Sequence, residues 1–212
     1  MHITQLVVGP LGTNCYLVRE EGGNKLLIID PGGEPQAILE ALAETGGTVS
    51  GIVCTHGHPD HTGALRQVAV ATGAPVHIHP ADTAMLRRTW PEFLVNEAAL
   101  GPGMKVREIR ENDTVTAGKM ALRVLHTPGH TPGGICLSAE EVAFTGDTLF
   151  AGGVGRADLA EGDPAALEQS LARLARELSP ITLVYPGHGE ATIMTQELAS
   201  NPWLAPGSAE AE

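Results

Sequence analysis

The stretch that decides the fold is Thr55-His56-Gly57-His58-Pro59-Asp60-His61, which ends the short apolar strand predicted at 51–55. Its three imidazoles and one carboxylate are ligands that suit divalent cations such as zinc, iron and manganese. In an extended loop, side chains two residues apart point the same way, so His56 and His58 can hold one ion. Asp60 and His61 follow Pro59, at the turn into a predicted helix, and can face a second ion. Four candidate ligands in one loop favour a metal centre over a polar surface loop.

Three later residues with ligand-capable side chains also stand where a predicted strand ends. His130 lies in a Gly- and Pro-rich turn at 127–134, Asp147 follows the apolar run 142–145, and His188 follows the run 181–185. A rigid scaffold presents functional side chains at such positions. With the first stretch they make five histidines and two aspartates. That set is enough for two ions with three or four protein ligands each and one shared carboxylate.

Length and composition predict one globular domain. A chain of 212 residues fits one domain at about 100–200 residues per domain. Hydrophobic residues make up 42% of the chain and charged residues 18%, which favours a sizeable core over disorder. We expect a single domain over residues 1–204 and a disordered acidic tail over 205–212.

The net charge and the cysteines limit which binding partners and which cellular compartment are expected. The formal charge of −12 opposes phosphate backbones and anionic lipids, so neither nucleic acid nor a membrane surface is expected as a partner. No apolar run approaches the roughly 20 residues of a membrane span, and the N-terminus lacks the pattern of a signal peptide. Cys15, Cys54 and Cys136 form no C-x-x-C pair and lie in apolar runs, which predicts buried thiols and a cytoplasmic location.

Strands in groups with interspersed helices predict sheets that are covered by helices. Strands are predicted at 3–8, 13–18, 25–29, 51–55, 75–79, 105–109, 114–116, 119–125, 135–138, 142–145 and 181–185. Helices are predicted from Pro35 to Gly46, at 61–71 and 81–88, after Asp163 along a stripe of leucines, and at 191–199, while 91–103 is expected to be loop with some helix.

The four motifs together resemble the metallo-β-lactamase superfamily, and most closely its glyoxalase II-like (hydroxyacylglutathione hydrolase-like) branch in its short bacterial form. They are T-H-x-H-x-D-H at 55–61, P-G-H-T-P-G at 128–133, F-T-G-D-T-L-F at 144–150 and P-G-H-G at 186–189, in this order. The resemblance implies an α+β fold, an αββα four-layer sandwich of two mixed sheets packed face to face with helices on both outer faces. It places a metal centre at one edge, between the sheets.

The resemblance also implies which residues hold the ions. A first ion would be held by His56, His58 and His130, and a second by Asp60, His61 and His188, with Asp147 bridging both. Asp30, in a family-like I-D-P-G turn, would support a ligating imidazole, because such rings need an acceptor for their other N–H. Two divalent ions are expected, zinc first and iron or manganese as alternatives, with single occupancy left open.

The implied activity is hydrolysis of a thioester or ester by a metal-bound hydroxide, with Asp60 orienting the nucleophile. No G-x-S-x-G elbow is present. The expected substrate is a small S-2-hydroxyacyl thioester such as S-lactoylglutathione. Arg156 matches the basic residue of a loop that helps glyoxalase II relatives bind glutathione, but Asp158 stands where those relatives carry an aromatic residue. The chain also stops soon after Trp203, where full-length relatives add a helical domain, and short bacterial relatives share both departures.

Three alternatives remain open from the sequence. The same scaffold could hold one iron and oxidise a persulfide, as in related sulfur dioxygenases, or it could act as a lactonase. A structural metal site in a binding module is disfavoured, because structural zinc sites usually close with four ligands and often include cysteine. The oligomeric state, monomer or homodimer, is not determined by the sequence.

Overall fold

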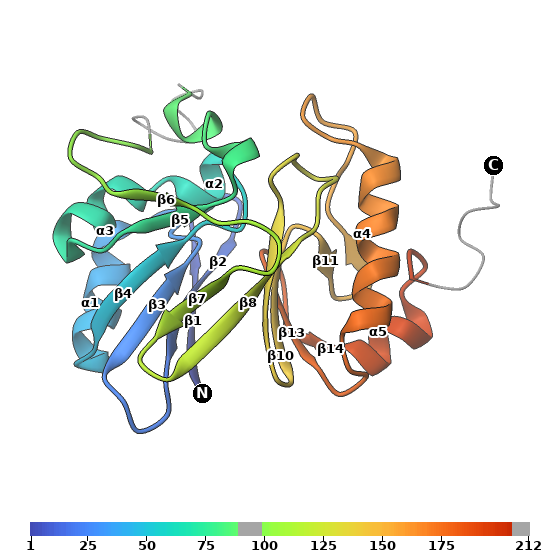
Figure 1. Cartoon of the computed structure of the whole chain (residues 1–212), viewed down its shortest axis with the longest axis horizontal. Helices are drawn as coiled ribbons and strands as arrows, with labels where there is room; N and C mark the ends of the chain where they lie inside the picture. The colour runs from blue at the N-terminus through green and yellow to red at the C-terminus, as the bar shows by residue number, and fades with distance from the viewer. Residues whose placement is uncertain (89–98, 205–212) are drawn as a thin grey trace.

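The computed structural model describes residues 1–88 and 99–204 and has four layers (Figure 1). Two six-stranded sheets pack face to face, and helices lie on the outer side of each. The expected αββα arrangement is therefore confirmed. The predicted tail at 205–212 and most of the ambiguous segment 91–103 lie outside the described residues.

The N-terminal sheet is mixed, with strand order β1-β2-β3-β4-β5-β6. Pairing is antiparallel from β1 to β3 and parallel from β3 to β6. The parallel pairs require crossovers, and α1 and α3 supply the first two of them on the outer face. The elements are β1 His2–Val8, β2 Thr13–Arg19, β3 Lys25–Ile29, α1 Pro35–Thr45, β4 Thr48–Val53, α3 Leu65–Thr72, β5 Val76–Ile78 and β6 Val106–Glu108.

The C-terminal sheet is also mixed, with strand order β14-β13-β10-β9-β8-β7. Its parallel pair, β10 with β13, is connected through α4, and its other pairs are antiparallel. A separate hairpin of β11 and β12 follows β10. The elements are β7 Thr114–Ala117, β8 Met120–His126, β9 Ile135–Ala139, β10 Val142–Gly146, β11 Leu149–Phe150, β12 Gly153–Val154, α4 Pro164–Glu177, β13 Leu183–Pro186, β14 Thr192–Ile193 and α5 Met194–Ser200.

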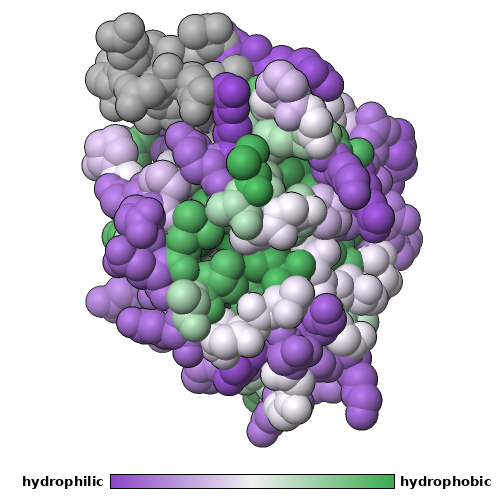
Figure 2. All heavy atoms as spheres, turned by 90° about the vertical axis from the view of Figure 1, so that its left-hand side faces the viewer, coloured by the Kyte–Doolittle hydropathy of each residue, from purple (hydrophilic) through white to green (hydrophobic). Residues whose placement is uncertain are grey.

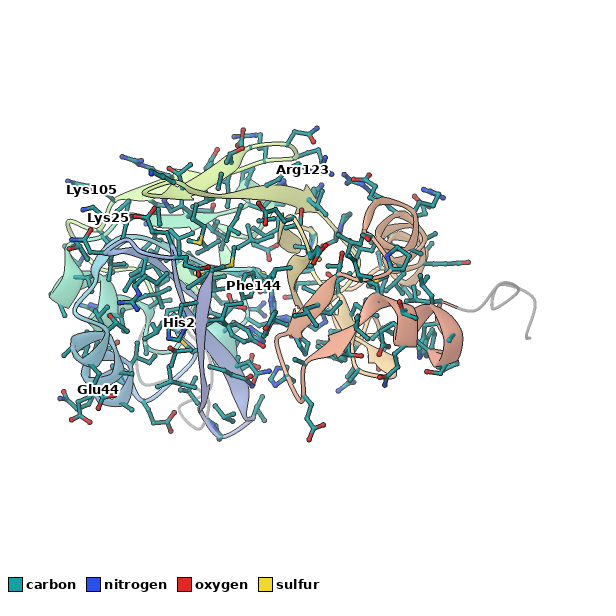
Figure 3. All side chains as sticks on the ribbon, turned by 90° about the horizontal axis from the view of Figure 1, so that it is seen from below. His2, Lys25, Glu44, Lys105, Arg123 and Phe144 are labelled. Atoms are coloured by element: carbon teal, nitrogen blue, oxygen red, sulfur yellow. The ribbon has the colours of Figure 1, made fainter. Side chains whose placement is uncertain are left out.

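Three apolar clusters hold the four layers together. Strand β3 shows why its sequence is continuously apolar: Leu26 and Ile28 pack under α1 and α3, whereas Leu27 and Ile29 pack between the sheets. Figure 3 shows Phe144 in the middle of the molecule, between the sheets, with charged side chains such as Lys105 at the periphery.

Helix α4 seals the outer face of the C-terminal sheet. Asp163 caps it by accepting a hydrogen bond from the Ala166 N–H, and Pro164 occupies the first turn. The predicted leucine stripe is confirmed, since its four members are buried in the cluster between α4 and the sheet: Leu167, Leu171, Leu174 and Leu178.

The predicted helix at 61–71 is wrong in its boundaries. The structure has a short helix α2 at Pro59–Thr62 and then α3 from Leu65. In a continuous helix the Ala64 N–H would bond to the carbonyl of Asp60, but it donates instead to the carbonyl of Pro31 at 2.9 Å. A contact distant in sequence therefore breaks the helix beside the candidate ligands.

Two other predicted helices differ from the structure. The segment 81–88 forms two 3-10 turns, η1 at Pro80–Asp82 and η2 at Met85–Arg87. The helix predicted at 191–199 starts three residues later, because Thr192 and Ile193 pair with β13 as strand β14. The β11–β12 hairpin was not predicted, since two-residue strands carry no periodicity.

The helices, the surface and the cysteines agree with what the composition predicts. Among the described residues, no helix is long and apolar enough to cross a membrane. Figure 2 views the side of the molecule on which α1 and α3 lie, where a patch of hydrophobic residues is bordered by hydrophilic ones. The three cysteines are buried and unpaired, as predicted.

Replacing Leu174 by Ala tests the packing of α4. The side chain is fully buried, so its loss should lower the free energy of unfolding by about 2–5 kcal/mol, measured by urea denaturation. Gln169→Ala, at an exposed position of the same helix, is the matched control. A Leu174→Ala change no larger than that control would contradict the assigned packing.

Candidate metal centre

The structure brings all seven sequence-predicted ligands together. They come from the segments that follow β4, β8, β10 and β13, with Asp60 and His61 in the short helix α2, and these segments meet at one edge between the two sheets. Three groups of them have ligand atoms within 4.8 Å of one another: His56 with His58 and His130, His56 with His61 and Asp147, and Asp60 with His61 and His188. The first and third groups are the two ligand sets that the resemblance implied, and their roles as ligands stay a proposal.

In the first group, two imidazole nitrogens already face each other. His58 Nδ1 lies 2.9 Å from His130 Nε2, and the His56 ring is 4.9 Å from the His58 ring between centroids. The other nitrogen of His130, Nδ1, donates to the carbonyl of Arg156 at 2.6 Å. That bond fixes the tautomer, so the Nε2 lone pair of His130 points into the group.

In the group of Asp60, His61 and His188, ligand atoms also face each other, and two of the side chains are partly exposed. His61 Nε2 lies 3.2 Å from His188 Nε2, and His188 Nε2 lies 3.2 Å from Asp60 Oδ2. The side chains of Asp60 and His188 are 12% and 25% exposed, whereas that of His61 is 0% exposed. On the side of this group, the centre is therefore more exposed to solvent at Asp60 and His188 than at His61.

Asp147 lies between the two groups. One of its carboxylate oxygens is 3.5 Å from His130 Nε2 and 3.6 Å from His188 Nε2, and the other is 3.3 Å from His61 Nε2. This is the position required of a bridging carboxylate.

The protonation states of two buried members suit metal binding. The pKa of His56 lies well below its usual value, first because of burial and then because of the neighbouring imidazoles, so the ring is neutral. Burial raises the pKa of Asp147, but His61 and the other imidazoles outweigh it and the net pKa is lowered. Neutral imidazole and ionised carboxylate are the forms that coordinate cations.

Two buried atoms test whether this donor set fits a metal. His56 Nε2 and Asp147 Oδ1 are buried and make no hydrogen bond to any described residue. Leaving a buried polar atom unsatisfied costs about 1–3 kcal/mol, so such atoms are rare without a reason. A coordinated cation would satisfy both, and the residues present therefore fit the expected group.

Asp30 supports His61, as expected for a residue behind a ligand. Its Oδ2 accepts from His61 Nδ1 at 2.9 Å and from the Thr55 hydroxyl at 2.6 Å, and its Oδ1 accepts from the Thr55 N–H at 2.7 Å. The residue has φ of 50°, a left-handed conformation that Asp tolerates better than most residues. The carboxylate thus orients His61 with its Nε2 toward the centre.

Glycines in the motifs are required by close approach. A Cβ at Gly187 would lie 2.2 Å from Asp147 Oδ1 and 2.7 Å from His61 Cε1. A Cβ at Gly32 would lie 1.8 Å from the carbonyl oxygen of Asp60. Side chains at these positions would displace candidate ligands, which explains the glycines beside them.

Asp82 is a site residue that sequence reasoning missed. Its buried carboxylate accepts from the Gly57 N–H at 2.9 Å, from the Thr131 hydroxyl at 2.7 Å and from the Gly133 N–H at 2.6 Å. One carboxylate therefore joins the loop of His56 and His58 to the turn of His130. No motif marks Asp82, since it stands in a plain H-P-A-D turn whose partner loops are distant in sequence.

Arg156 is not directed at the centre. Its guanidinium forms two hydrogen bonds of 2.9 Å to the carboxylate of Asp158, and both side chains are 69% exposed. Exposed ion pairs contribute little, so this pair can open for a substrate at small cost. The residue that replaced the expected aromatic is thus the partner of Arg156, and substrate binding by Arg156 stays a prediction.

Comparison with known proteins now adds to this geometry. The family model described as the metallo-β-lactamase superfamily matches residues 8–188. The chain belongs to the metallo-β-lactamase superfamily. Fold and family together make it a metallo-β-lactamase-fold hydrolase with a His/Asp metal-binding cluster.

Individual relatives match this chain along almost its whole length. A protein named hydroxyacylglutathione hydrolase from Haemophilus influenzae is 33% identical over 96% of this chain and 98% of its own length. The structure of TTHA1623 in a di-iron-bound form is 38% identical with a TM-score of 0.83, covering 95% of this chain and 100% of that one. ETHE1 from Myxococcus xanthus is 29% identical with a TM-score of 0.81, covering 100% of this chain and 86% of that one. The predicted glyoxalase II-like resemblance is confirmed.

Asp82→Asn tests the connection between the two loops. An amide cannot accept from all three donors, so the first ligand group should loosen while Asp60, His61 and His188 keep their supports. We expect affinity for zinc at one of two sites to fall about 10–100-fold, measured by competition with a chromophoric chelator.

Asp113→Asn, at an exposed turn, is the control for Asp82→Asn. Equal zinc affinity and stoichiometry in the two variants would contradict the assigned role of Asp82.

Proposed function

We propose that the protein hydrolyses a thioester or ester, most specifically an S-2-hydroxyacyl thioester such as S-lactoylglutathione. The observation that carries this proposal is the convergence of seven candidate ligand side chains, two of which have a buried atom with no hydrogen-bond partner among the described residues, His56 Nε2 and Asp147 Oδ1. The hydroxyacylglutathione hydrolase name of a relative at 33% identity supports the substrate class.

We propose that two divalent ions bind here, the first to His56, His58 and His130 and the second to Asp60, His61 and His188. Asp147 would be shared by both ions. A pair of such ions, when bound, supplies Lewis-acid polarisation of the carbonyl and activation of water at neutral pH. Zinc is the proposed metal, with iron or manganese as alternatives, and the di-iron-bound form of a relative at 38% identity gives iron particular weight.

The chain's own residues divide the remaining work. Asp60 lies at the accessible side of the centre, where Thr13 donates to its Oδ2 at 3.3 Å, and we assign it the orientation of the attacking water. Thiolate chemistry is excluded, because Cys15, Cys54 and Cys136 are all fully buried and burial raises the pKa of each thiol. Water is thus the nucleophile that the site supports.

The partners and location follow from the same features. The substrate is a small molecule, with Arg156 as the candidate contact to a substrate carboxylate. We infer a cytoplasmic protein, since all three cysteines are unpaired, and a monomer or homodimer that binds neither nucleic acid nor membranes.

Elemental analysis combined with a substrate panel tests the function. Purified protein should contain up to two equivalents of metal and hydrolyse S-lactoylglutathione faster than lactones. Removal of metal with a chelator should abolish hydrolysis, and added zinc, iron or manganese should restore it. One equivalent of iron with oxygen consumption on a thiol persulfide, and no hydrolysis, would favour the dioxygenase alternative instead.

Asp147→Ala and His58→Ala test the ligand assignment. Each variant should remain folded, as judged by circular dichroism, with activity on the hydrolysed thioester reduced by at least about 10³-fold. His2→Ala, far from the loops of the centre in sequence, serves as a control. Activity near that of the wild type in either ligand variant would remove the proposed mechanism.

A further inference from the structure

The turn that carries His188 is held by a residue from the opposite half of the molecule. Asn14 lies in β2 of the N-terminal sheet and is 1% exposed, whereas Pro186 ends β13 of the C-terminal sheet. The Asn14 side chain donates from Nδ2 to the Pro186 carbonyl at 3.0 Å and to the Gly189 carbonyl at 2.9 Å. Its backbone N–H donates to the Gly187 carbonyl at 2.7 Å. Asn14 therefore binds the turn on both sides of His188.

Two neighbours support this arrangement of the Asn14 amide. Gln5 in β1 donates to Asn14 Oδ1 at 2.7 Å, so the amide NH2 is turned toward the carbonyl groups of the turn. The Tyr16 hydroxyl donates to the same Pro186 carbonyl at 2.6 Å. The oxygen and the nitrogen of the amide are thus both hydrogen-bonded, as a buried polar side chain requires. An aspartate at this position would have no donor for the turn.

His188 depends on its backbone turn more than two other candidate ligands depend on theirs. The Nδ1 atom of His61 donates to Asp30 at 2.9 Å. The Nδ1 atom of His130 donates to the Arg156 carbonyl at 2.6 Å. The polar contacts of the His188 ring with described residues all involve Nε2, which faces the other candidate ligands. The position of this ring is therefore set by the turn that Asn14 holds.

The residue before Asn14 approaches the same candidate ligands. Thr13 forms an isolated antiparallel bridge with His188, and its hydroxyl donates to Asp60 Oδ2 at 3.3 Å. His188 Nε2 lies 3.2 Å from both Asp60 Oδ2 and His61 Nε2. The start of β2 therefore contacts two of the three members of this group.

We propose that Asn14 is the positioning residue of His188 and that it sets how tightly Asp60, His61 and His188 hold an ion. The proposal rests on the proposed function in one respect, since it takes these three side chains as ligands. Hydrogen bonds that orient ligands commonly contribute about 10–100-fold to metal affinity. Because the side-chain amide of Asn14 donates to the His188 turn, its loss should weaken one ion and spare the other.

Asn14→Asp removes both donors with almost no change in size. Its carboxylate would face the carbonyl oxygens of Pro186 and Gly189, and the unpaired oxygens should displace the turn. Asn14→Ala removes the same two hydrogen bonds without adding a charge, and it takes the place of Asn14→Asp if that variant does not fold. Asn24→Asp, at an exposed position, is the control for charge. Leu174→Ala, in the cluster beneath α4, is the control for lost stability.

The readout is zinc binding by the whole chain, measured by competition with a chromophoric chelator. Two bound ions should give two steps, of which His188→Gln removes one and His58→Ala the other. Asn14→Asp should weaken the step that His188→Gln removes by about 10–100-fold and leave the other step unchanged. Both controls should keep both steps.

Three results would overturn the proposal. The first is equal zinc affinity of Asn14→Asp and Asn24→Asp at both steps. The second is an equal loss at both steps, since a general loss of structure explains it. The third is a loss confined to the step that His58→Ala removes.

A measurement on the metal-free protein separates this proposal from the proposed function. The ring Cε1–H resonance of His188 in the NMR spectrum is assigned by its absence in His188→Gln. In Asn14→Asp this resonance should shift or broaden, whereas those of His58 and His130 should stay in place.

A wild type that binds two zinc ions and hydrolyses no thioester contradicts the proposed function, and the zinc steps still decide the role of Asn14. A wild type that binds fewer than two ions contradicts the proposed ion pair and the affinity part of this proposal. The His188 resonance then decides the positioning role, which an unchanged resonance in Asn14→Asp would overturn.

Discussion

The constraint on which the structure depends is the burial of mutually facing ligand atoms at one edge of the sandwich. Facing imidazole nitrogens lie 2.9 and 3.2 Å apart there, and imidazole nitrogens lie 3.2–3.6 Å from carboxylate oxygens. His56 Nε2 and Asp147 Oδ1 have no hydrogen-bond partner among the described residues. Removing such atoms from water is unfavourable unless something compensates them. Apolar packing supplies the rigidity that holds them in place, since each strand that presents a ligand has side chains in at least one of the three buried clusters. A coordinated cation would turn this unfavourable arrangement into a favourable one.

Two buried carboxylates outside the ligand sets show how the loops are kept in register. Asp30 joins the end of β3 to Thr55 and His61, and Asp82 joins the His56–His58 loop to the His130 turn. Each accepts three hydrogen bonds, and each connects segments from different parts of the chain. Because each carboxylate accepts several hydrogen bonds at once, these connections resist the motion of a loop more than a single hydrogen bond would. The geometry of the centre is therefore specified by residues that do not reach it.

The sequence predicted the layers and the ligand candidates because both leave local signals. Continuous apolar runs such as 25–29 mark strands that are buried on both faces, and the leucine stripe of α4 marks a helix with one buried face. The seven candidate ligands were found because they follow those strands. Asp82, the break at Ala64 and the β11–β12 hairpin were missed, because each depends on a partner distant in sequence: Gly133, Pro31 and Glu197. Periodicity and motif spacing contain no information about such partners.

The tight packing behind the candidate ligands limits which positions can change the substrate. The backbone leaves no room for a Cβ at three glycines. A Cβ at Gly129 would collide with Leu167, and a Cβ at Gly155 or Gly187 would collide with Asp147. Substitution at these positions would move candidate ligands and so alter any reaction of the centre. Ala165 and Glu168, by contrast, are exposed on α4 and line a cavity between this helix and the loop after β12, where a larger or oppositely charged side chain displaces no backbone. Substitutions on this face of α4 can therefore accumulate while the packing around the candidate ligands stays the same. This separation gives a physical reason why one scaffold can host different substrate preferences without a change in the packing of its centre.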